Sequence, residues 1–219
     1  NPASPRPAGR GPPPPGLMGR AFVDAVFPAG VVNVVTNAPE HGPAVVERLI
    51  AHPLVRRVNF TGSTKVGRIV GELAGRHLKP ALLELGGKAP LIVLDDADID
   101  AAINASVFSS FLHQGQICMS SERLIVHDAV ADAFSAGLAA RASKLPAGDP
   151  AGAVVLGTLI ECSAAEAMRE LILDAEGKGA VRVAGGRIEG AVVAATVLDR
   201  VTPEMRIYHE ESFGPVKPI

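Results

Sequence analysis

Two residues of the chain, Glu84 and Cys118, have side chains suited to covalent catalysis. Glu84 follows the apolar run 81–83 and precedes the glycine pair Gly86-Gly87, whereas Cys118 lies in the polar, glycine-bearing stretch 114–119. A thiolate can attack a carbonyl carbon, and a carboxylate can take a proton from water. The pair therefore indicates a cysteine nucleophile that works with a glutamate base.

Each of these residues also has an ordinary structural explanation. A lone cysteine is more often inert than reactive, but the polar setting of Cys118 favours partial exposure and reactivity. The other cysteine, Cys162, begins a predicted helix and is interpreted as structural. For Glu84 the alternative is an acidic strand end that faces solvent. The glycines after it would let a ligand approach the backbone closely.

The composition of the chain limits which classes of partner and which cellular compartment we expect. The formal net charge is -2 and no basic patch occurs, so we expect no nucleic-acid partner. No apolar run approaches the ~20 residues of a spanning helix, so we expect no membrane partner. The two cysteines make no disulfide framework, which favours the cytoplasm. We expect no metal site.

The first half of the chain alternates between predicted helices and strands. Residues 1–16 are rich in proline and glycine, which predicts a disordered or polyproline-like segment; a frameshifted coding stretch is the open alternative. Beyond it, hydrophobic periodicity predicts helices over 17–27, 43–52 and 66–74 and strands over 31–35, 55–60 and 81–85. The alternation indicates a parallel sheet with crossover helices.

The second half repeats the alternation with longer helices. Strands are predicted over 90–94, 122–127, 181–184 and 192–197, and helices over 99–112 and 128–143. A further helix is expected after a capping box at 163–166, ending at Gly177 or Gly179. The boundary between two α/β units is placed at the glycine pair, which gives domains 17–85 and 86–219.

Two further segments could contact a ligand. Gly62 and Ser63 lie between a predicted strand and a helix start, where free N–H groups attract phosphate. A simply capped helix is the equal alternative. Glu211 and Phe213 precede a Gly-Pro turn, for which a solvated loop is the ordinary reading.

Together these segments resemble the aldehyde dehydrogenase superfamily over about residues 28–219. The resemblance rests on four segments in the family's order: Phe60-Thr61-Gly62-Ser63, Leu83-Glu84-Leu85-Gly86-Gly87-Lys88, Gly115-Gln116-Ile117-Cys118 and Glu211-Ser212-Phe213-Gly214-Pro215. It implies an α/β fold: part of a Rossmann-like parallel-sheet NAD-binding domain, followed by part of an α/β catalytic domain.

The resemblance also implies roles for individual residues. Cys118 would be the nucleophile, and Glu84 would activate the water that releases the product. The cofactor-binding residues would lie against the dinucleotide phosphates (Gly62, Ser63), near the nicotinamide (Leu85, Gly86, Phe213) and on its ribose (Glu211).

The implied reaction is the oxidation of an aldehyde to a carboxylic acid through a thiohemiacetal and a thioester on Cys118. NAD is the expected cofactor, with NADP open. The segments 113–120 and 202–205 resemble the branch that acts on aromatic aldehydes such as salicylaldehyde, vanillin or benzaldehyde. A small-molecule aldehyde is the expected partner, and the parent enzyme is expected to be a homo-oligomer.

Two alternatives to this function are carried forward. Family members are longer than this chain, and an asparagine oxyanion donor and the first nucleotide-binding elements have no counterpart in it. A catalytically inactive fragment or remnant that keeps the core fold is therefore one alternative. A coenzyme-A-acylating aldehyde dehydrogenase is the other, although a water-activating Glu84 argues against it.

Overall fold

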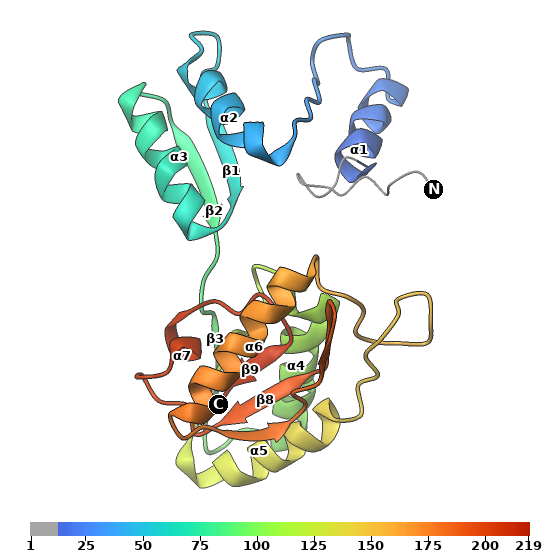
Figure 1. Cartoon of the computed structure of the whole chain (residues 1–219), viewed down its shortest axis with the longest axis vertical. Coiled ribbons are helices and arrows are strands. Elements are labelled where there is room, and N and C mark those ends of the chain that lie inside the picture. The colour runs from blue at the N-terminus through green and yellow to red at the C-terminus, as the bar shows by residue number, and fades with distance from the viewer. Residues whose placement is uncertain (1–12) are drawn as a thin grey trace. The chain divides into compact units, whose positions relative to one another are not determined.

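A computed structural model describes residues 13–219, which form two compact units, the first ending at Leu85 and the second beginning at Gly86. Figure 1 shows both units and labels their α-helices and several of their strands. Each unit mixes helices with short sheets, so both are α/β. Within residues 13–219, no helix combines the length and apolarity needed to cross a bilayer.

The first unit contains one pair of parallel strands and the helices that flank it. Its elements are α1 (Pro13–Asp24), η1 (Pro39–His41), α2 (Gly42–Ala51), β1 (Val58–Gly62), α3 (Thr64–Arg76) and β2 (Ala81–Leu85). Strands β1 and β2 pair in parallel with α3 as the crossover between them. Side chains of α2 and α3, with Ile50, Val70 and Ala74 at the centre, pack against one face of this pair.

The helix α1 begins four residues before the predicted start. Of the proline-rich segment 1–16, residues 1–12 lie outside the described residues, and residues 13–16 form the first turn of α1. The expectation that the whole segment excludes a helix was too strict. The first N–H groups of a helix have no intrahelical acceptor, so prolines there break no hydrogen bond.

The predicted strand over residues 31–35 is wrong. These residues form bends and irregular backbone, and their side chains are exposed. A β-branched run favours extended backbone, but a strand also needs a neighbour that takes its N–H and C=O groups. Within residues 13–219 no strand pairs with this run, and the local preference alone does not make a strand.

The second unit has a mixed three-stranded sheet and two smaller strand pairs. Its strands are β3 (Pro90–Val93), β4 (Arg123–Val126), β5 (Val181–Ala184), β6 (Ile188–Glu189), β7 (Val192–Val193), β8 (Thr196–Asp199) and β9 (Val216–Pro218). Strands β3 and β4 are parallel, β6 and β7 are antiparallel, and β8 lies between antiparallel β5 and parallel β9. Strand β9 also lies next to β4.

Helices cover both faces of the strand β8. The helices are α4 (Ile99–Phe111), η2 (Leu112–Gly115), α5 (Asp128–Ala142), α6 (Cys162–Gly177) and α7 (Arg206–His209). Val197 packs into the core shared with α4 and α5, whereas the next residue, Leu198, packs into the core under α6. Successive side chains of a strand point to opposite faces, so β8 is buried on both.

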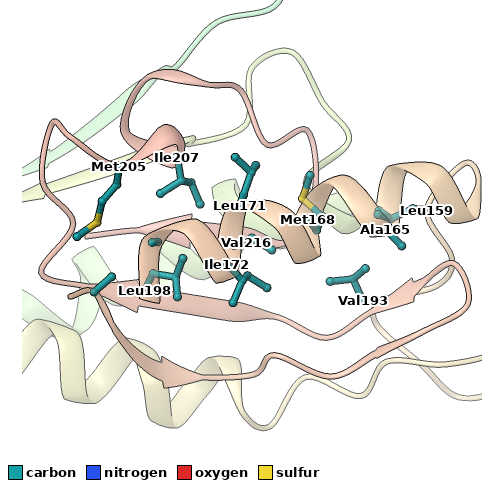
Figure 2. Close-up of a cluster of buried hydrophobic side chains, with 12 residues drawn as sticks. Leu159, Ala165, Met168, Leu171, Ile172, Val193, Leu198, Met205, Ile207 and Val216 are labelled. Atoms are coloured by element: carbon teal, nitrogen blue, oxygen red, sulfur yellow. The ribbon is translucent and has the colours of Figure 1, made fainter. Parts of the chain in front are cut away.

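The core under α6 is a continuous apolar layer, shown in Figure 2. Met168, Leu171 and Ile172 of α6 face Leu198 of β8 and Val216 of β9. The predicted capping box at 163–166 is wrong, because α6 begins at Cys162 with Glu161 as its N-cap. The helix ends at Gly177, one of the two predicted ends, but it begins earlier than predicted, and the polar residue at position 163 lies already inside the first turn.

Candidate active site

The cysteine predicted to be the nucleophile lies at the centre of a tight turn. The N–H of Ser120 donates to the carbonyl of Ile117 at 2.9 Å, which closes a β-turn around Cys118 and Met119. Cys118 is exposed and carries a free thiol. The turn therefore presents the sulfur to solvent, as a nucleophile requires.

The backbone leading into this turn is left-handed at three consecutive residues. His113, Gln114 and Gly115 have φ values of 51°, 58° and 71°. Left-handed backbone costs a non-glycine residue roughly 1–2 kcal/mol, and such conformations persist where the surroundings fix them. A Cβ on Gly115 would overlap the carbonyl group of Gly214, lying 2.8 Å from its carbon. The cysteine turn thus packs backbone to backbone against the loop that contains Gly214.

That loop carries Glu211 and Phe213. A carboxylate oxygen of Glu211 accepts a hydrogen bond from the N–H of Gly87 at 3.3 Å. A Cβ on Gly86 would lie 2.6 Å from the carboxyl carbon of Glu211, so the missing side chain makes room for the acid. Burial raises the pKa of Glu211, and the nearby carboxylate of Glu122 adds to the rise. Phe213 is left-handed with φ 46° and its side chain is 46% exposed.

A buried ion cluster, which sequence reasoning missed, lies beneath this loop. Glu122 is 4% exposed, and its two carboxylate oxygens each lie 2.9 Å from an ammonium group, one from Lys88 and one from Lys217. The N–H of Ser212 donates to Glu122 at 2.8 Å, its hydroxyl lies at 2.8 Å, and the N–H of Phe213 donates at 3.2 Å. We call Lys88, Glu122, Ser212 and Lys217 the Glu122 cluster.

The charges of the Glu122 cluster stabilise an ionised carboxylate. Burial alone would raise the pKa of Glu122, but the ammonium groups of Lys217 and Lys88 outweigh it, and the pKa lies below its ordinary value. Burial lowers the pKa of both lysines, and Glu122 opposes that shift. Hydrogen bonds to an ionised acceptor are roughly twice as strong as neutral ones. The N–H groups of the loop at Ser212 and Phe213 therefore donate to an ionised acceptor, which makes these hydrogen bonds stronger than neutral ones.

One sequence signal could have pointed to this cluster. Glu122 comes two residues before the apolar run 124–126, and Lys217 lies between Val216 and Pro218, so both charges border or interrupt apolar segments. A charge in such a position needs a partner, because burying it alone is costly. The partners are 95 residues apart, and the sequence does not say which charges meet.

In the first unit, the predicted cofactor residues lie at the carboxyl ends of the parallel strands. Gly62 ends β1 and is paired in register with Leu85, which ends β2. Ser63 is the N-cap of α3, and its hydroxyl accepts from the N–H of Val66 at 3.3 Å. Ligands of open α/β sheets bind at this edge of the strands, but a contact of these residues with phosphate stays a prediction.

Glu84 lies on the open face of β2. It is exposed, as is Leu82 two residues before it, whereas Leu83 and Leu85 are partly covered. Leu85 packs on α3, since a Cβ on Gly67 would lie 2.7 Å from one of its methyl groups. The acid thus does not interrupt an apolar core in this unit, and its role as a base stays a prediction.

Comparison with known proteins agrees with this fold. The chain matches the aldehyde dehydrogenase family over residues 5–219 and therefore belongs to it. A vanillin dehydrogenase of Pseudomonas fluorescens is 61% identical over 201 residues, which are 91% of this chain and 42% of that protein. A salicylaldehyde dehydrogenase of Pseudomonas putida is 50% identical over 202 residues, which are 91% of this chain and 42% of that protein.

Solved structures of relatives have the same fold. The crystal structure of a salicylaldehyde dehydrogenase from Pseudomonas putida G7 complexed with salicylaldehyde superposes with a TM-score of 0.90 at 48% identity, covering 92% of this chain and 42% of that one. An NAD-dependent benzaldehyde dehydrogenase from Corynebacterium glutamicum gives 0.86 at 42% identity, covering 93% and 44%. The chain spans about two fifths of the length of these relatives and has the aldehyde dehydrogenase fold over that part.

Proposed function

We propose that this chain provides the nucleophile and part of the cofactor site of an NAD(P)-dependent dehydrogenase that oxidises an aromatic aldehyde to a carboxylic acid. The observation that carries the proposal is the packing of the cysteine turn against the loop of Glu211 and Phe213, through Gly115 and Gly214. This contact brings the nucleophile next to the loop that is expected to bind the cofactor. The arrangement suits a reaction in which the carbon attacked by the cysteine then transfers a hydride to the cofactor. The names of the relatives support an aromatic substrate.

The residues of the second unit fit a dinucleotide. A carboxylate accepts hydrogen bonds from sugar hydroxyls, and Glu211 is half-buried beside Gly86, where the backbone has no side chain to block an approach. The exposed ring of Phe213 offers an apolar face for a nicotinamide. When bound, NAD(P)⁺ would supply the hydride acceptor. NAD is the cofactor proposed, with NADP as the alternative, since relatives of both kinds are known.

The reaction uses the chain's residues in two stages. The Cys118 thiolate adds to the aldehyde carbon to form a thiohemiacetal, and loss of the hydride leaves a thioester on the same sulfur. Glu84 then takes a proton from water, whose oxygen replaces the sulfur at the acyl carbon. One aldehyde, one water and one NAD(P)⁺ thereby give one carboxylic acid, one NAD(P)H and one proton.

The proposal extends to domains, compartment and assembly. Residues 17–85 would belong to the dinucleotide-binding domain and residues 86–219 to the catalytic domain. The protein would work in the cytoplasm, where reduced thiols persist, and would form a homo-oligomer with a small-molecule aldehyde as its partner.

The nucleophile can be tested with the 219-residue chain alone. An activated ester such as 4-nitrophenyl acetate should acylate Cys118 and release a burst of nitrophenolate, with the added acetyl group located by mass spectrometry. Cys162→Ala is a matched control, because both thiols are free and exposed; it should keep the burst, and Cys118→Ala should lose it. Equal bursts from the two variants would refute the role of Cys118.

The complete reaction needs a protein of the full family length. The matching segment of the salicylaldehyde dehydrogenase of Pseudomonas putida can be replaced by this chain, and NADH absorbance followed with salicylaldehyde, vanillin and benzaldehyde. Turnover that Cys118→Ala abolishes supports the proposal. Glu84→Gln should release one equivalent of NADH per site and then stop, because the thioester is not hydrolysed. An acyl-coenzyme A product instead of the acid would favour the coenzyme-A-acylating alternative.

A further inference from the structure

The carboxylate of Glu122 holds two consecutive backbone N–H groups of the predicted cofactor loop. The N–H of Ser212 donates to one oxygen at 2.8 Å, and the N–H of Phe213 donates to the other at 3.2 Å. The hydroxyl of Ser212 is also within hydrogen-bond distance, at 2.8 Å. One buried side chain thus fixes the backbone between Glu211 and Phe213, the two residues expected to touch the cofactor.

The loop adopts a conformation that needs such support. Phe213 is left-handed, with φ 46°, and its ring is 46% exposed. Left-handed backbone is a genuine outlier for a bulky residue and persists only where the surroundings impose it. The N–H of Phe213 donates to the buried carboxylate of Glu122 at 3.2 Å. This hydrogen bond is a direct restraint on the backbone of the left-handed residue.

The lysines of the cluster keep the carboxylate in place. Lys217 is fully buried and donates to Glu122 at 2.9 Å and to the hydroxyl of Ser120 at 3.1 Å. Lys88 donates to the other oxygen of Glu122 at 2.9 Å. Because Ser120 closes the turn around Cys118, the cluster connects the nucleophile turn with the cofactor loop.

We infer that Glu122 is a positioning residue for the cofactor loop: its carboxylate imposes the left-handed backbone at Phe213 and thereby sets where Phe213 and Glu211 meet the dinucleotide. The inference rests on the proposed function of that loop. Glu122 itself touches neither cofactor nor substrate in this assignment and acts through the backbone of Ser212 and Phe213.

A first experiment measures the loop without any assumption about activity. Glu122→Gln keeps the shape of the side chain, but its amide nitrogen cannot accept a hydrogen bond. Hydrogen exchange of the 219-residue chain should then speed up at the amides of Ser212 and Phe213 by at least tenfold relative to amides of α6, a helix of the same unit. The control is Leu138→Ala, a fully buried site of α5 outside the cluster. Each variant is measured at the same number of degrees below its own Tm. Unchanged relative exchange in Glu122→Gln would overturn the inference.

A second experiment separates positioning from simple loss of folded protein. In the full-length chimera, Glu122→Gln should raise KM for NAD⁺ at least tenfold, and KM, unlike Vmax, does not depend on how many sites are folded. The ester burst at Cys118, which needs no cofactor, counts the folded sites for kcat. Leu138→Ala should leave KM within twofold. A KM shift of equal size in both variants would overturn the inference. Absent turnover in the parent chimera would refute the proposed function, while the exchange experiment would still decide the role of Glu122.

Discussion

Replacing Gly115 by alanine should separate the cysteine turn from the cofactor loop. The new Cβ would overlap the carbonyl group of Gly214, lying 2.8 Å from its carbon, and would lie 3.0 Å from the carbonyl oxygen of Ser110. Both neighbours are backbone atoms, so neither can rotate away as a side chain would. The backbone at Gly115 is also left-handed, with φ 71°, which alanine tolerates poorly.

The magnitude follows from these two contributions. Left-handed backbone costs alanine roughly 1–2 kcal/mol, and overpacking of a tight contact costs a further 1–3 kcal/mol, approximately. The free energy of unfolding of the second unit should therefore fall by about 2–5 kcal/mol. For a unit of this size, 1 kcal/mol corresponds to roughly 4 °C in Tm, so the expected decrease in Tm is about 8–20 °C.

The sequence provides both the probe and the control. The chain has one tyrosine and no tryptophan, and Tyr208 lies in the second unit, so tyrosine fluorescence during heating reports that unit alone. Gly190→Ala is the control, because Gly190 has φ 58° but no atom within 4 Å of an added Cβ. Gly190→Ala should lower Tm only by the cost of left-handed backbone at alanine, because the new Cβ overlaps no other atom. A decrease in Tm for Gly115→Ala no larger than that for Gly190→Ala would show that the turn and the loop are not in close backbone contact at Gly115.

Three further predictions concern the cap of α3, the cofactor carboxylate and the buried cluster. Ser63→Ala removes the N-cap of α3 and should lower the stability of the first unit by about 1 kcal/mol, measured by circular dichroism, whereas Ser63→Asn should retain it. Gly86→Ala displaces a flexible Glu211 side chain, so in the full-length chimera it should weaken NAD⁺ binding at least fivefold by titration while Tm stays within about 2 °C; unchanged binding would contradict the role of Glu211. Because the pKa of Glu122 in the folded chain lies below its ordinary 4.5, its stabilisation is complete above about pH 4.5 and is lost as the pH falls through the lower, folded pKa. Tyrosine fluorescence should therefore show a steeper acid loss of stability in the parent chain than in Glu122→Gln, and equal slopes would count against the ionised cluster.

Local sequence patterns predicted most elements of the fold. The strand 81–85 matches β2 in full, and α4 and α5 begin where their periodicity and caps placed them, at Ile99 and Asp128. These elements carry their own signals: an apolar face, a capping side chain, or a glycine at the end. The β-branched run 31–35 carried the strand signal without a pairing strand, and pairing is a property of distant residues that a local pattern does not contain.

The residues of the candidate site show the same difference between local signals, which a sequence contains, and contacts between distant residues, which it does not. Cys118, Glu211 and Phe213 were proposed because each belongs to a contiguous segment that resembles a segment of the family, and their roles stay predictions. Glu122 and Lys217 were not singled out, because Glu122 is a charge directly before β4 and Lys217 a charge within β9, and their significance comes from meeting each other. The contact of Gly115 with Gly214 could not be predicted from the sequence either. A glycine in a loop can be required by a turn, a ligand or a close backbone contact, and the sequence does not say which.

The wide sequence separation within the Glu122 cluster has a consequence for folding kinetics. The hydrogen bonds of Glu122 to Ser212 and Lys217 span 90 and 95 residues. Closing a loop of that length costs roughly 4 kcal/mol of chain entropy beyond a constant, and such non-local contacts form slowly. The cluster should therefore assemble only after β9 reaches β8 and β4. During refolding, the thiol of Cys118 should therefore reach its final reactivity toward an alkylating agent later than the helices around it form.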